Sequence, residues 1–289
     1  MKITTVNVNG VRAAFRKGFG DWLANDDSEL YCLQEVRATV EDTVTLFGAA
    51  FDVRVWPCRI KGRAGVALVA RRDSAFSLGD TREGLPAALY DESGEPDVDS
   101  GRWLEAEVSL PGGGSLTLVS AYLHSGELGS EKQEQKLAYL ERATKRLSEL
   151  AATARAAGAG AAQALVCGDF NIVRTERDIK NWKPNHNKVS GVMDEEIAIL
   201  DAWMSDSLEG TAKHPAVDVT RALLGEVQGP YTWWSQRGKA FDNDAGWRID
   251  YQMATPGLAT HAAEVSVWRA PSYAERWSDH APLSITYQI

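Results

Sequence analysis

The chain has 289 residues, of which 44% are hydrophobic and 25% are charged, and its formal net charge is −9. This composition is typical of a globular domain with a sizeable core; it excludes a disordered chain, and no uncharged apolar run approaches the length of a membrane-spanning helix. The negative net charge argues against nucleic-acid binding by the surface as a whole, because phosphate neutralisation needs Lys and Arg, so local clusters of charge must decide that question.

Domain organisation and location follow from the same general features. A chain of this length fits one large two-sheet unit, so we expect residues 1–289 to form a single domain. The N-terminal segment has neither the apolar stretch nor the cleavage site of a signal peptide, which predicts a cytoplasmic protein. Cys32, Cys58 and Cys167 lack CxxC spacing, and we interpret them as core residues rather than as metal ligands or a disulfide framework.

Short apolar segments rich in β-formers recur along the whole chain. Some alternate apolar and polar residues and others are apolar on both faces, which predicts sheets that pack on each other and are partly covered by helices. The predicted strands cover residues 2–8, 29–34, 65–70, 102–110, 115–123, 164–170, 248–255, 262–268 and 282–288.

Three segments have helical periodicity. The clearest covers residues 130–150, where leucines recur on one stripe and Ser130 can cap the first turn. Residues 194–206 predict a second helix, and residues 16–25 a weaker third. The Ala- and Gly-rich segment 151–164 has the composition of a linker, but a strand follows at once, so we interpret it as a helix tail and a loop.

Unusual polar residues lie at or just past the ends of these strands. Each alone has a structural explanation, such as an Asx turn, a satisfied buried amide or half of an ion pair. Together they crowd carboxylates that would raise one another's pKa unless a cation held them ionised. Oxygen ligands without further His or Cys favour Mg²⁺, with Mn²⁺ as a substitute, over zinc. The residues are Asn7, Asn9, Gln34, Glu35, Tyr122, His124, Asp169, Asn171, Asp250, Asp279 and His280.

Six short motifs occur in order over nearly the full length of the chain: NVNGVRA (7–13), LQE (33–35), AY (121–122), GDFN (168–171), GWRIDY (246–251) and SDHAPL (278–283). The set resembles the exonuclease III family of apurinic/apyrimidinic (AP) endonucleases, within the larger endonuclease/exonuclease/phosphatase superfamily. GDFN and SDHxP are typical of the superfamily, and the other motifs narrow the resemblance to its DNA-repair branch. The resemblance implies an α/β four-layer sandwich like that of deoxyribonuclease I, in which two facing mixed β-sheets are flanked by helices.

The resemblance also implies a metal site and a phosphate contact. Glu35 matches the family's principal metal-binding carboxylate, and Asp279 matches a supplementary ligand. Asn9 stands near the metal where some relatives carry an aspartate, so the site lacks one further carboxylate. His280 matches the histidine that contacts the scissile phosphate, and Asp250 would pair with it and favour its charged ring.

Water activation is assigned to a second group of residues by the same resemblance. Asp169 matches the residue that orients and deprotonates the attacking water. Asn171 and Asn7 would position that water, the phosphate or Asp169 itself. Tyr122 would donate to the phosphate or assist the leaving group.

Substrate choice requires other residues, because an enzyme acting at an abasic nucleotide must extrude it into a pocket that excludes normal nucleotides. By resemblance, Trp233, Trp247 and Ile249 line that pocket, whereas Trp234 is expected to pack in the core. The loop after Tyr122 is acidic and lacks the arginine that some relatives insert into DNA, which argues against groove penetration by this loop.

Basic residues gather in three runs near the motif loops, at residues 59–63, 174–188 and 237–248. One such run is usually a solvated face, but three runs beside the same loops favour contacts to DNA phosphates. We assign four of these basic residues to substrate binding: Arg174, Lys180, Lys188 and Arg248, which is the arginine of GWRIDY.

The predicted function is Mg²⁺-dependent hydrolysis of the phosphodiester 5′ to an abasic site, with 3′-to-5′ exonuclease and 3′-phosphodiesterase or phosphatase activity. The predicted partner is double-stranded DNA with abasic sites or blocked 3′ ends, bound by a monomer at the nucleoid and not by a membrane protein. One alternative is a phosphatase or phospholipase of the same superfamily, which would lack the aromatic pocket. The other is a catalytically silent DNA-binding scaffold, which would not need a residue that activates water.

Overall fold

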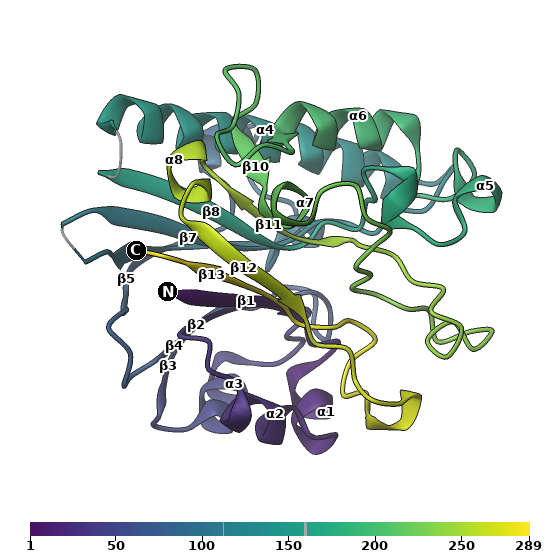
Figure 1. Cartoon of the computed structure of the whole chain (residues 1–289), viewed down its shortest axis with the longest axis horizontal. Coiled ribbons are helices and arrows are strands. Elements are labelled where there is room, and N and C mark those ends of the chain that lie inside the picture. Colours follow the sequence, from purple (N-terminus) through teal and green to yellow (C-terminus); the bar gives the residue numbers. More distant parts are fainter. Residues whose placement is uncertain (112, 159–160) are drawn as a thin grey trace.

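The central strands are apolar on both faces, and they build two β-sheets that pack against each other (Figure 1). The computed structural model describes residues 1–111, 113–158 and 161–289. The first sheet has six strands in the order β12-β13-β1-β2-β4-β3, and the second has seven in the order β5-β6-β7-β8-β11-β10-β9. Both sheets mix parallel and antiparallel pairs, since β1 pairs parallel with β2 and antiparallel with β13, and β8 pairs parallel with β7 and antiparallel with β11.

The first sheet consists of β1 (Lys2–Asn7), β2 (Leu30–Gln34), β3 (Phe51–Trp56), β4 (Val66–Arg71), β12 (Ala262–Val267) and β13 (Leu283–Tyr287). The second consists of β5 (Leu78–Glu83), β6 (Trp103–Ser109), β7 (Ser115–Tyr122), β8 (Ala162–Asp169), β9 (Met204–Ser205), β10 (Ala216–Asp218) and β11 (Asp250–Ala254). The α-helices within the described residues are α1 (Val11–Arg16), α2 (Phe19–Asn25), α3 (Val40–Phe47), α4 (Glu131–Ala157), α5 (Trp182–Asn185), α6 (Asp194–Trp203), α7 (Val219–Leu224) and α8 (Pro256–Ala259).

Three apolar clusters hold the layers together. Leu68 and Leu118 belong to the cluster between the two sheets. Leu140 of α4 and Trp203 of α6 pack on the outer face of the second sheet, and Phe19 of α2 packs on the outer face of the first. The result is helix, sheet, sheet, helix in four layers (Figure 1). The predicted α/β sandwich is confirmed.

The predicted elements are present in the structure, but their bounds differ and some observed strands were not predicted. Each predicted strand overlaps an observed one, but the sequence pattern missed β3, β5 and the two short strands β9 and β10. The predicted helix 130–150 is α4, which continues to Ala157, and residues 159–160 of the Ala/Gly-rich segment lie outside the described residues. The weak helix 16–25 is instead α1 and α2, which are separated at Gly18 with a φ of 106°.

Strand direction brings distant polar residues to one edge of the sandwich. The parallel neighbours β7 and β8 place Tyr122 beside Asp169. Asp250 begins β11 rather than ending a strand, and the antiparallel pairing with β8 puts it directly opposite Asp169. In the other sheet, Leu283 at the start of β13 pairs with Thr5 near the end of β1. The segment that precedes β13 therefore lies beside the segment that follows β1.

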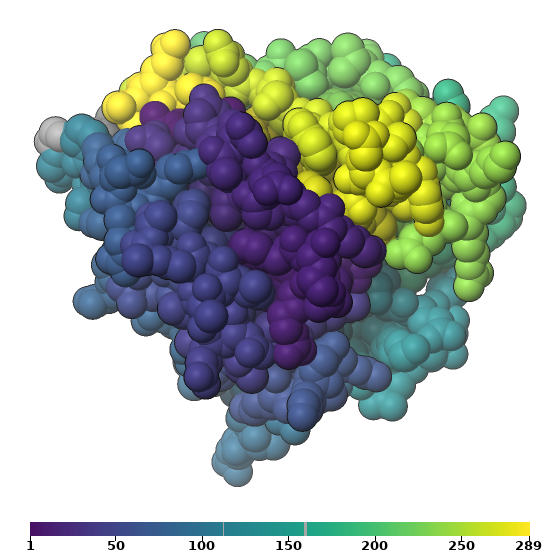
Figure 2. Space-filling model, turned by 90° about the horizontal axis from the view of Figure 1, so that it is seen from below, coloured from purple at the N-terminus to yellow at the C-terminus, as the bar shows by residue number. Residues whose placement is uncertain are grey.

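The two ends of the chain lie side by side at one edge of the sandwich (Figure 1), and the view from below shows the purple N-terminal segments beside the yellow C-terminal ones (Figure 2). This follows from the pairing of the first strand, β1, with the last, β13. Among the described residues, no helix combines the length and the apolar character that crossing a membrane requires.

Candidate active site

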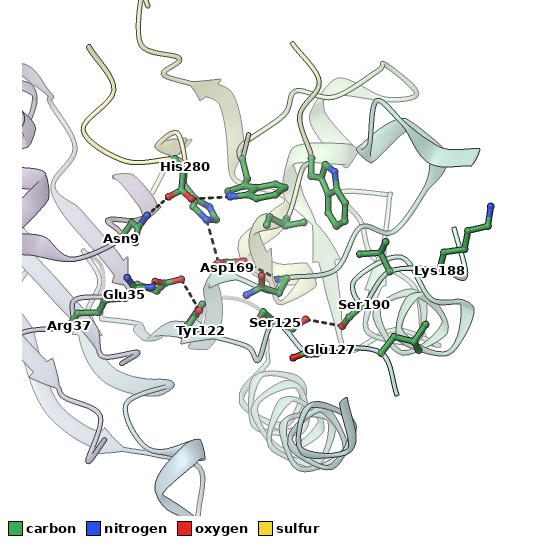
Figure 3. Close-up of a pocket in the computed structure, with 18 residues that line it drawn as sticks. Asn9, Glu35, Arg37, Tyr122, Ser125, Glu127, Asp169, Lys188, Ser190 and His280 are labelled. Carbon is green, nitrogen blue, oxygen red and sulfur yellow. Dashed lines mark hydrogen bonds and ion pairs between the residues drawn. The ribbon is translucent and has the colours of Figure 1, made fainter. Parts of the chain in front are cut away.

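An open cavity of about 610 Å³ lies at the edge where β1, β2, β7 and β8 end (Figure 3). Polar side chains occupy one wall and aromatic and aliphatic side chains the other, so the cavity offers both hydrogen bonds and an apolar surface. Its lining includes Asn9, Glu35, Arg37, Tyr122, Asp169, Asn171, Lys188, Ser190, Trp233, Trp247, Ile249, Asp279 and His280. Most of the residues that the sequence assigned to a site therefore share one cavity.

Asp169 is at the centre of the polar wall, at the end of β8. It is 1% exposed, and it accepts hydrogen bonds from the side-chain amide of Asn7 at 2.9 Å and from the backbone N–H of Asn171 at 2.9 Å. Burial and the nearby charges of Asp250 and Glu35 raise the pKa of Asp169 to about 7, although His280 and Asn7 act in the opposite direction. A carboxyl with that pKa exchanges protons readily near neutral pH.

His280 bridges two carboxylates. Its Nδ1 lies 2.9 Å from Asp250 Oδ2 and its Nε2 lies 3.6 Å from Asp169 Oδ2. Burial alone would lower the pKa of His280, but the charges of Asp250 and Asp169 raise it to about 10. The ring is therefore a cation at neutral pH, and a buried cation at the rim of a cavity is suited to bind an anion.

Glu35 and Tyr122 form a second hydrogen-bonded group beside Asp169. The Tyr122 hydroxyl donates to Glu35 Oε1 at 2.7 Å, and Asn7 also donates to that oxygen at 3.0 Å. Burial and the Glu35 charge raise the pKa of Tyr122 well above its usual value, so the phenol keeps its proton and remains a donor. The other Glu35 oxygen contacts the guanidinium of Arg37.

Asp279 completes the acidic part of the cavity. Asn9 donates to its Oδ1 at 2.8 Å and the Trp233 indole donates to its Oδ2 at 3.2 Å. Burial would raise the pKa of Asp279, but the His280 charge and these two donors lower it, so the group is ionised. Glu35, Asp279 and Asn9 thus offer carboxylate and amide oxygens to one cavity, and this donor chemistry fits a hard divalent ion such as Mg²⁺.

Asp169, Asp250 and His280 also offer ligand atoms within 4.8 Å of one another. The hydrogen bond that His280 donates to Asp250 and the positive charge of the ring already explain this group, since the ring compensates the two carboxylates between which it lies. Glu35 and Asp279, which line the same cavity, are the residues that could hold a divalent ion through their oxygens.

Several residues that line this cavity have a left-handed backbone conformation. Asn9, Glu35 and Asn171 have φ values of 46°, 50° and 52°, in the left-handed region that side chains other than glycine rarely adopt. Such conformations cost free energy and concentrate at functional sites. Gly168 in GDFN is required for another reason, because a Cβ there would lie 1.8 Å from the backbone oxygen of Ala121.

The apolar wall is formed by the residues predicted for the abasic pocket. Trp233 and Trp247 pack edge to face with ring centroids 5.5 Å apart, and their backbones are hydrogen-bonded at 2.8 Å. Ile249 is buried beneath them and still lines the cavity. Trp234 packs against Phe241 at 5.3 Å between ring centroids, outside the cavity, as expected.

Two of the four predicted cationic contacts are wrong. Arg248 is 0% exposed, and its guanidinium donates to Asp178 at 2.7 Å and to Asp218 at 2.8 Å. Arg174 is 7% exposed and pairs with Asp218 at 3.1 Å and with Asp206 at 2.6 Å. Neither guanidinium is free to reach a phosphate, because carboxylates distant in sequence already bind it.

The two lysines are placed differently. Lys188 is exposed at the outer edge of the cavity, and its ammonium group points away from the polar wall (Figure 3). Lys180 is exposed, and its backbone N–H donates to the carbonyl of Gly246, next to Trp247. A role of these two residues in DNA binding remains a prediction.

The sequence reasoning missed several residues that surround the cavity. Arg37 follows Glu35 by two positions, and a cation that close to a proposed metal ligand was an available signal. Ser125 and Ser190 gave none, because isolated serines in loops are common. They meet in the fold, where the Ser190 hydroxyl donates to the Ser125 carbonyl at 2.8 Å (Figure 3).

Comparisons with known proteins agree with this geometry. A family model described as the Endonuclease/Exonuclease/phosphatase family matches residues 4–280. The chain is 26% identical to an exodeoxyribonuclease of Bacillus subtilis, with 100% of both chains covered. It is 25% identical to the DNA repair nuclease APEX1 of Danio rerio, over 99% of this chain and 81% of that protein.

Solved structures share the fold at similarly low identity. An AP endonuclease from Archaeoglobus fulgidus has a TM-score of 0.75 at 24% identity, with 100% of both chains covered. The 3′ phosphatase NExo from Neisseria, bound to a product DNA hairpin, has a TM-score of 0.77 at 24% identity, again with 100% of both chains covered. At this identity the two structures establish the sandwich fold alone.

Proposed function

This chain belongs to the endonuclease/exonuclease/phosphatase family, and from that premise we propose that it is a metal-dependent DNA repair nuclease. It hydrolyses the phosphodiester 5′ to abasic sites and has 3′-to-5′ exonuclease and 3′-phosphodiesterase or phosphatase activity on duplex DNA. Its relatives support a nuclease function, since they include an exodeoxyribonuclease and a DNA repair nuclease.

The observation that carries the proposal is the position of Asp169 in the polar wall of a cavity whose other wall is apolar. Asn7 and Asn171 fix the carboxyl group, and its pKa of about 7 lets it take a proton from water at neutral pH. Within the same cavity, Trp233 and Trp247 offer a surface that fits a sugar without a base. Water activation and base exclusion are thus combined in one cavity.

The remaining polar residues act on the phosphate. Charged His280, fixed by Asp250, stabilises the phosphate oxygens as negative charge develops on them. Tyr122 keeps its proton and donates toward the same group or toward the departing 3′ oxygen. Each of these side chains is buried or held by a hydrogen bond, so little reorganisation is needed during the reaction.

Glu35 and Asp279, with Asn9 beside them, would hold a divalent ion, and we propose Mg²⁺ with Mn²⁺ as a substitute. The bound ion would offset negative charge on the non-bridging phosphate oxygens. Arg37 also contacts Glu35, so a cation already lies beside this carboxylate.

The proposed partner is double-stranded DNA that carries an abasic site or a blocked 3′ end. Lys180 and Lys188 would contact its phosphates, because both are exposed and lie next to the cavity wall. We expect a monomer that acts in the cytoplasm, at the nucleoid.

The test is a duplex with one abasic-site analogue, incubated with Mg²⁺ or with chelator. We expect a nick 5′ to the analogue only with Mg²⁺, and we expect Asp169→Asn to lower the rate by about 10²–10⁴-fold through loss of the base. Asp21→Asn, which changes an exposed carboxylate on α2, serves as the matched control.

Two other outcomes would replace the proposal. Binding to the duplex without any nick would indicate a silent DNA-binding scaffold. Hydrolysis of a soluble phosphate ester or a phospholipid, unaffected by Trp247→Ala and unaccompanied by nicking, would indicate a phosphatase or phospholipase.

A further inference from the structure

A buried ammonium group lies beneath the cavity and has no part in the reaction described above. Lys136 is in the second turn of α4, and its side chain is 0% exposed. Burying an ammonium group is costly unless it is paired and hydrogen-bonded, so its surroundings should explain why it is there.

The ammonium of Lys136 is bound by three separate segments that line the cavity. It donates to the backbone oxygen of Asn171 at 3.0 Å, to the Ser190 hydroxyl at 3.2 Å and to the backbone oxygen of Ser125 at 3.4 Å. These acceptors follow β8, precede α6 and follow β7, respectively. One positive charge therefore joins three of the loops that surround the proposed reaction centre.

Glu196 on α6 compensates this charge and adds contacts of its own. Its Oε1 lies 2.8 Å from the Lys136 ammonium and accepts from Gln133 at 2.8 Å, and the Glu196 side chain is 0% exposed. Its Oε2 accepts from the backbone N–H of Gly191 and, at 3.3 Å, from that of Met193. Glu196 thereby fixes the start of α6 and the end of the loop that carries Lys188.

The loop next to this pair packs closely against its neighbours at Gly191. Gly191 has a φ of 91°, and a Cβ there would lie 2.6 Å from the backbone oxygen of Asn171 and 3.4 Å from the Trp247 ring. The Asn171 segment, which fixes Asp169, and the apolar wall are thus in contact through Gly191. A shift of this loop would move both walls of the cavity relative to each other.

We propose that Lys136 and Glu196 are positioning residues for the nuclease reaction, holding the segments of Ser125, Asn171 and Ser190 in the arrangement that aligns the two walls of the cavity. This inference rests on the proposed function, because it concerns the alignment of the same reaction centre. A purely structural ion pair would stabilise the fold without affecting the chemical step in the folded enzyme. Misalignment by about 1 Å can reduce a rate by about 10²-fold, so the two roles are distinguishable.

The experiment compares wild type, Lys136→Met, Glu196→Gln and the double variant K136M/E196Q. Each single variant leaves one buried charge unpaired and should be less stable than the wild type. The double variant removes both charges and should recover most of the lost stability. Thermal unfolding of each variant is measured together with kcat and KM on the abasic duplex with Mg²⁺. We expect the double variant to have near-wild-type unfolding, unchanged KM and a kcat lower by about 10²-fold.

The control is a second buried pair on the same helix. Arg146 on α4 donates to Glu105 with two bonds of 2.7 Å, and neither residue lines the cavity. The variant R146M/E105Q should retain wild-type kcat. A double variant K136M/E196Q that is folded and turns over at the wild-type rate would overturn the proposal.

Ser190→Ala provides a milder test if K136M/E196Q does not fold. It removes only the hydroxyl that contacts Lys136, Glu196 and Ser125. We expect a lower kcat with unchanged KM, and a raised KM with unchanged kcat would overturn the proposal by indicating direct contact with DNA. A failure of the proposed function would instead appear in the wild-type enzyme, as no turnover of the abasic duplex.

Discussion

Two clusters of buried charge lie near the start of β11, and they differ in whether their charges are compensated. The acid-histidine cluster consists of Asp169, Asp250 and His280. The arginine network consists of Arg174, Asp178, Asp218, Arg221 and Arg248. Both clusters involve the GWRIDY motif, which contributes one residue to each.

The pKa values separate the two clusters. In the arginine network, burial would raise the pKa of Asp178, but Arg248 and Arg221 lower it to about 2. In the acid-histidine cluster, burial raises the pKa of Asp169 to about 7 despite His280. A fully paired carboxylate is a structural anion, whereas an incompletely paired one can exchange a proton. Compensation, rather than burial, therefore distinguishes the structural cluster from the proposed reactive one.

The largest effect on stability is expected from breaking the arginine network. Arg248→Met removes the shared partner of Asp178 and Asp218 and leaves buried carboxylates with less compensation. We expect a loss of about 3–5 kcal/mol in the free energy of unfolding, measured by denaturant titration. Arg237→Met, at an exposed position, should change it by less than about 0.5 kcal/mol. A small loss for R248M would mean that the network does not stabilise the fold.

Asp169→Asn should change the free energy of unfolding in the opposite direction from Arg248→Met. The folded protein resists ionising this carboxyl group, which ionises freely in the unfolded chain, so at neutral pH its charge destabilises the fold. We expect the asparagine variant to be more stable by about 1–3 kcal/mol in chelator, although it loses nuclease activity. The check is a denaturant titration at pH 7, and destabilisation by D169N would contradict the contrast between the clusters.

The pH dependence of stability should reverse between the two clusters. As the pH falls below about 4, Asp178 becomes protonated in the unfolded chain but stays ionised in the folded protein until the pH reaches about 2. The contribution of the ionised Asp178 to the stability of the fold is therefore lost on acidification. Between pH about 6.5 and 10 the folded protein keeps a proton on His280 that the unfolded chain releases. This second contribution is complete below pH about 6.5 and is lost as the pH rises through about 10.

The decline in stability at alkaline pH is easier to measure than the decline at acid pH. One proton changes the free energy of unfolding by at most about 1.4 kcal/mol per pH unit, and we expect a decline of that order between pH about 7 and 10 in chelator. His280→Asn should flatten the decline, because the group that retains the proton is gone. An unchanged slope in H280N would show that other groups cause it.

The smallest effect concerns the exposed cations, and it sharpens the comparison between buried and exposed charge. Lys188→Ala should leave the unfolding midpoint unchanged, weaken DNA binding about equally for all sequences, and reduce the salt slope of binding by about 1. Binding is measured by fluorescence anisotropy across a salt series. If K188A leaves the slope unchanged, Lys188 does not contact a phosphate.

Much of the site could be read from the sequence because its chemistry lies in short motifs. Asp169 and Asn171 follow a continuous apolar strand, and Asp279 and His280 precede another, so polar residues at strand ends marked the region. The pairing of His280 with Asp250 and the packing of Trp234 were also expected, and both are observed. The motif order identified the family, and with it the sandwich.

The same motifs led to a wrong prediction for two arginines. Arg174 and Arg248 lie in or beside motifs of the site, and their charge suggested contact with phosphate. Their partners are carboxylates elsewhere in the chain, such as Asp178 and Asp218, which are 70 and 30 residues from Arg248. Nothing local in the sequence marks those aspartates as neighbours of an arginine. Lys136 was missed for the same reason, because on a helix it resembles any lysine of the solvent face.

The sequence by itself determined the family, most of the strands and the side chains that could take part in the chemistry, because these depend on residue type and local order. Only the tertiary structure decided that Arg248 is buried and neutralised by carboxylates. Only the tertiary structure likewise decided that Asp169, which pairs with Asp250 on the neighbouring strand, keeps an exchangeable proton. The physical reason is that the charge state and reach of a buried group depend on which opposite charges and hydrogen-bond donors surround it. Those neighbours come from strands and helices that meet only when the chain folds.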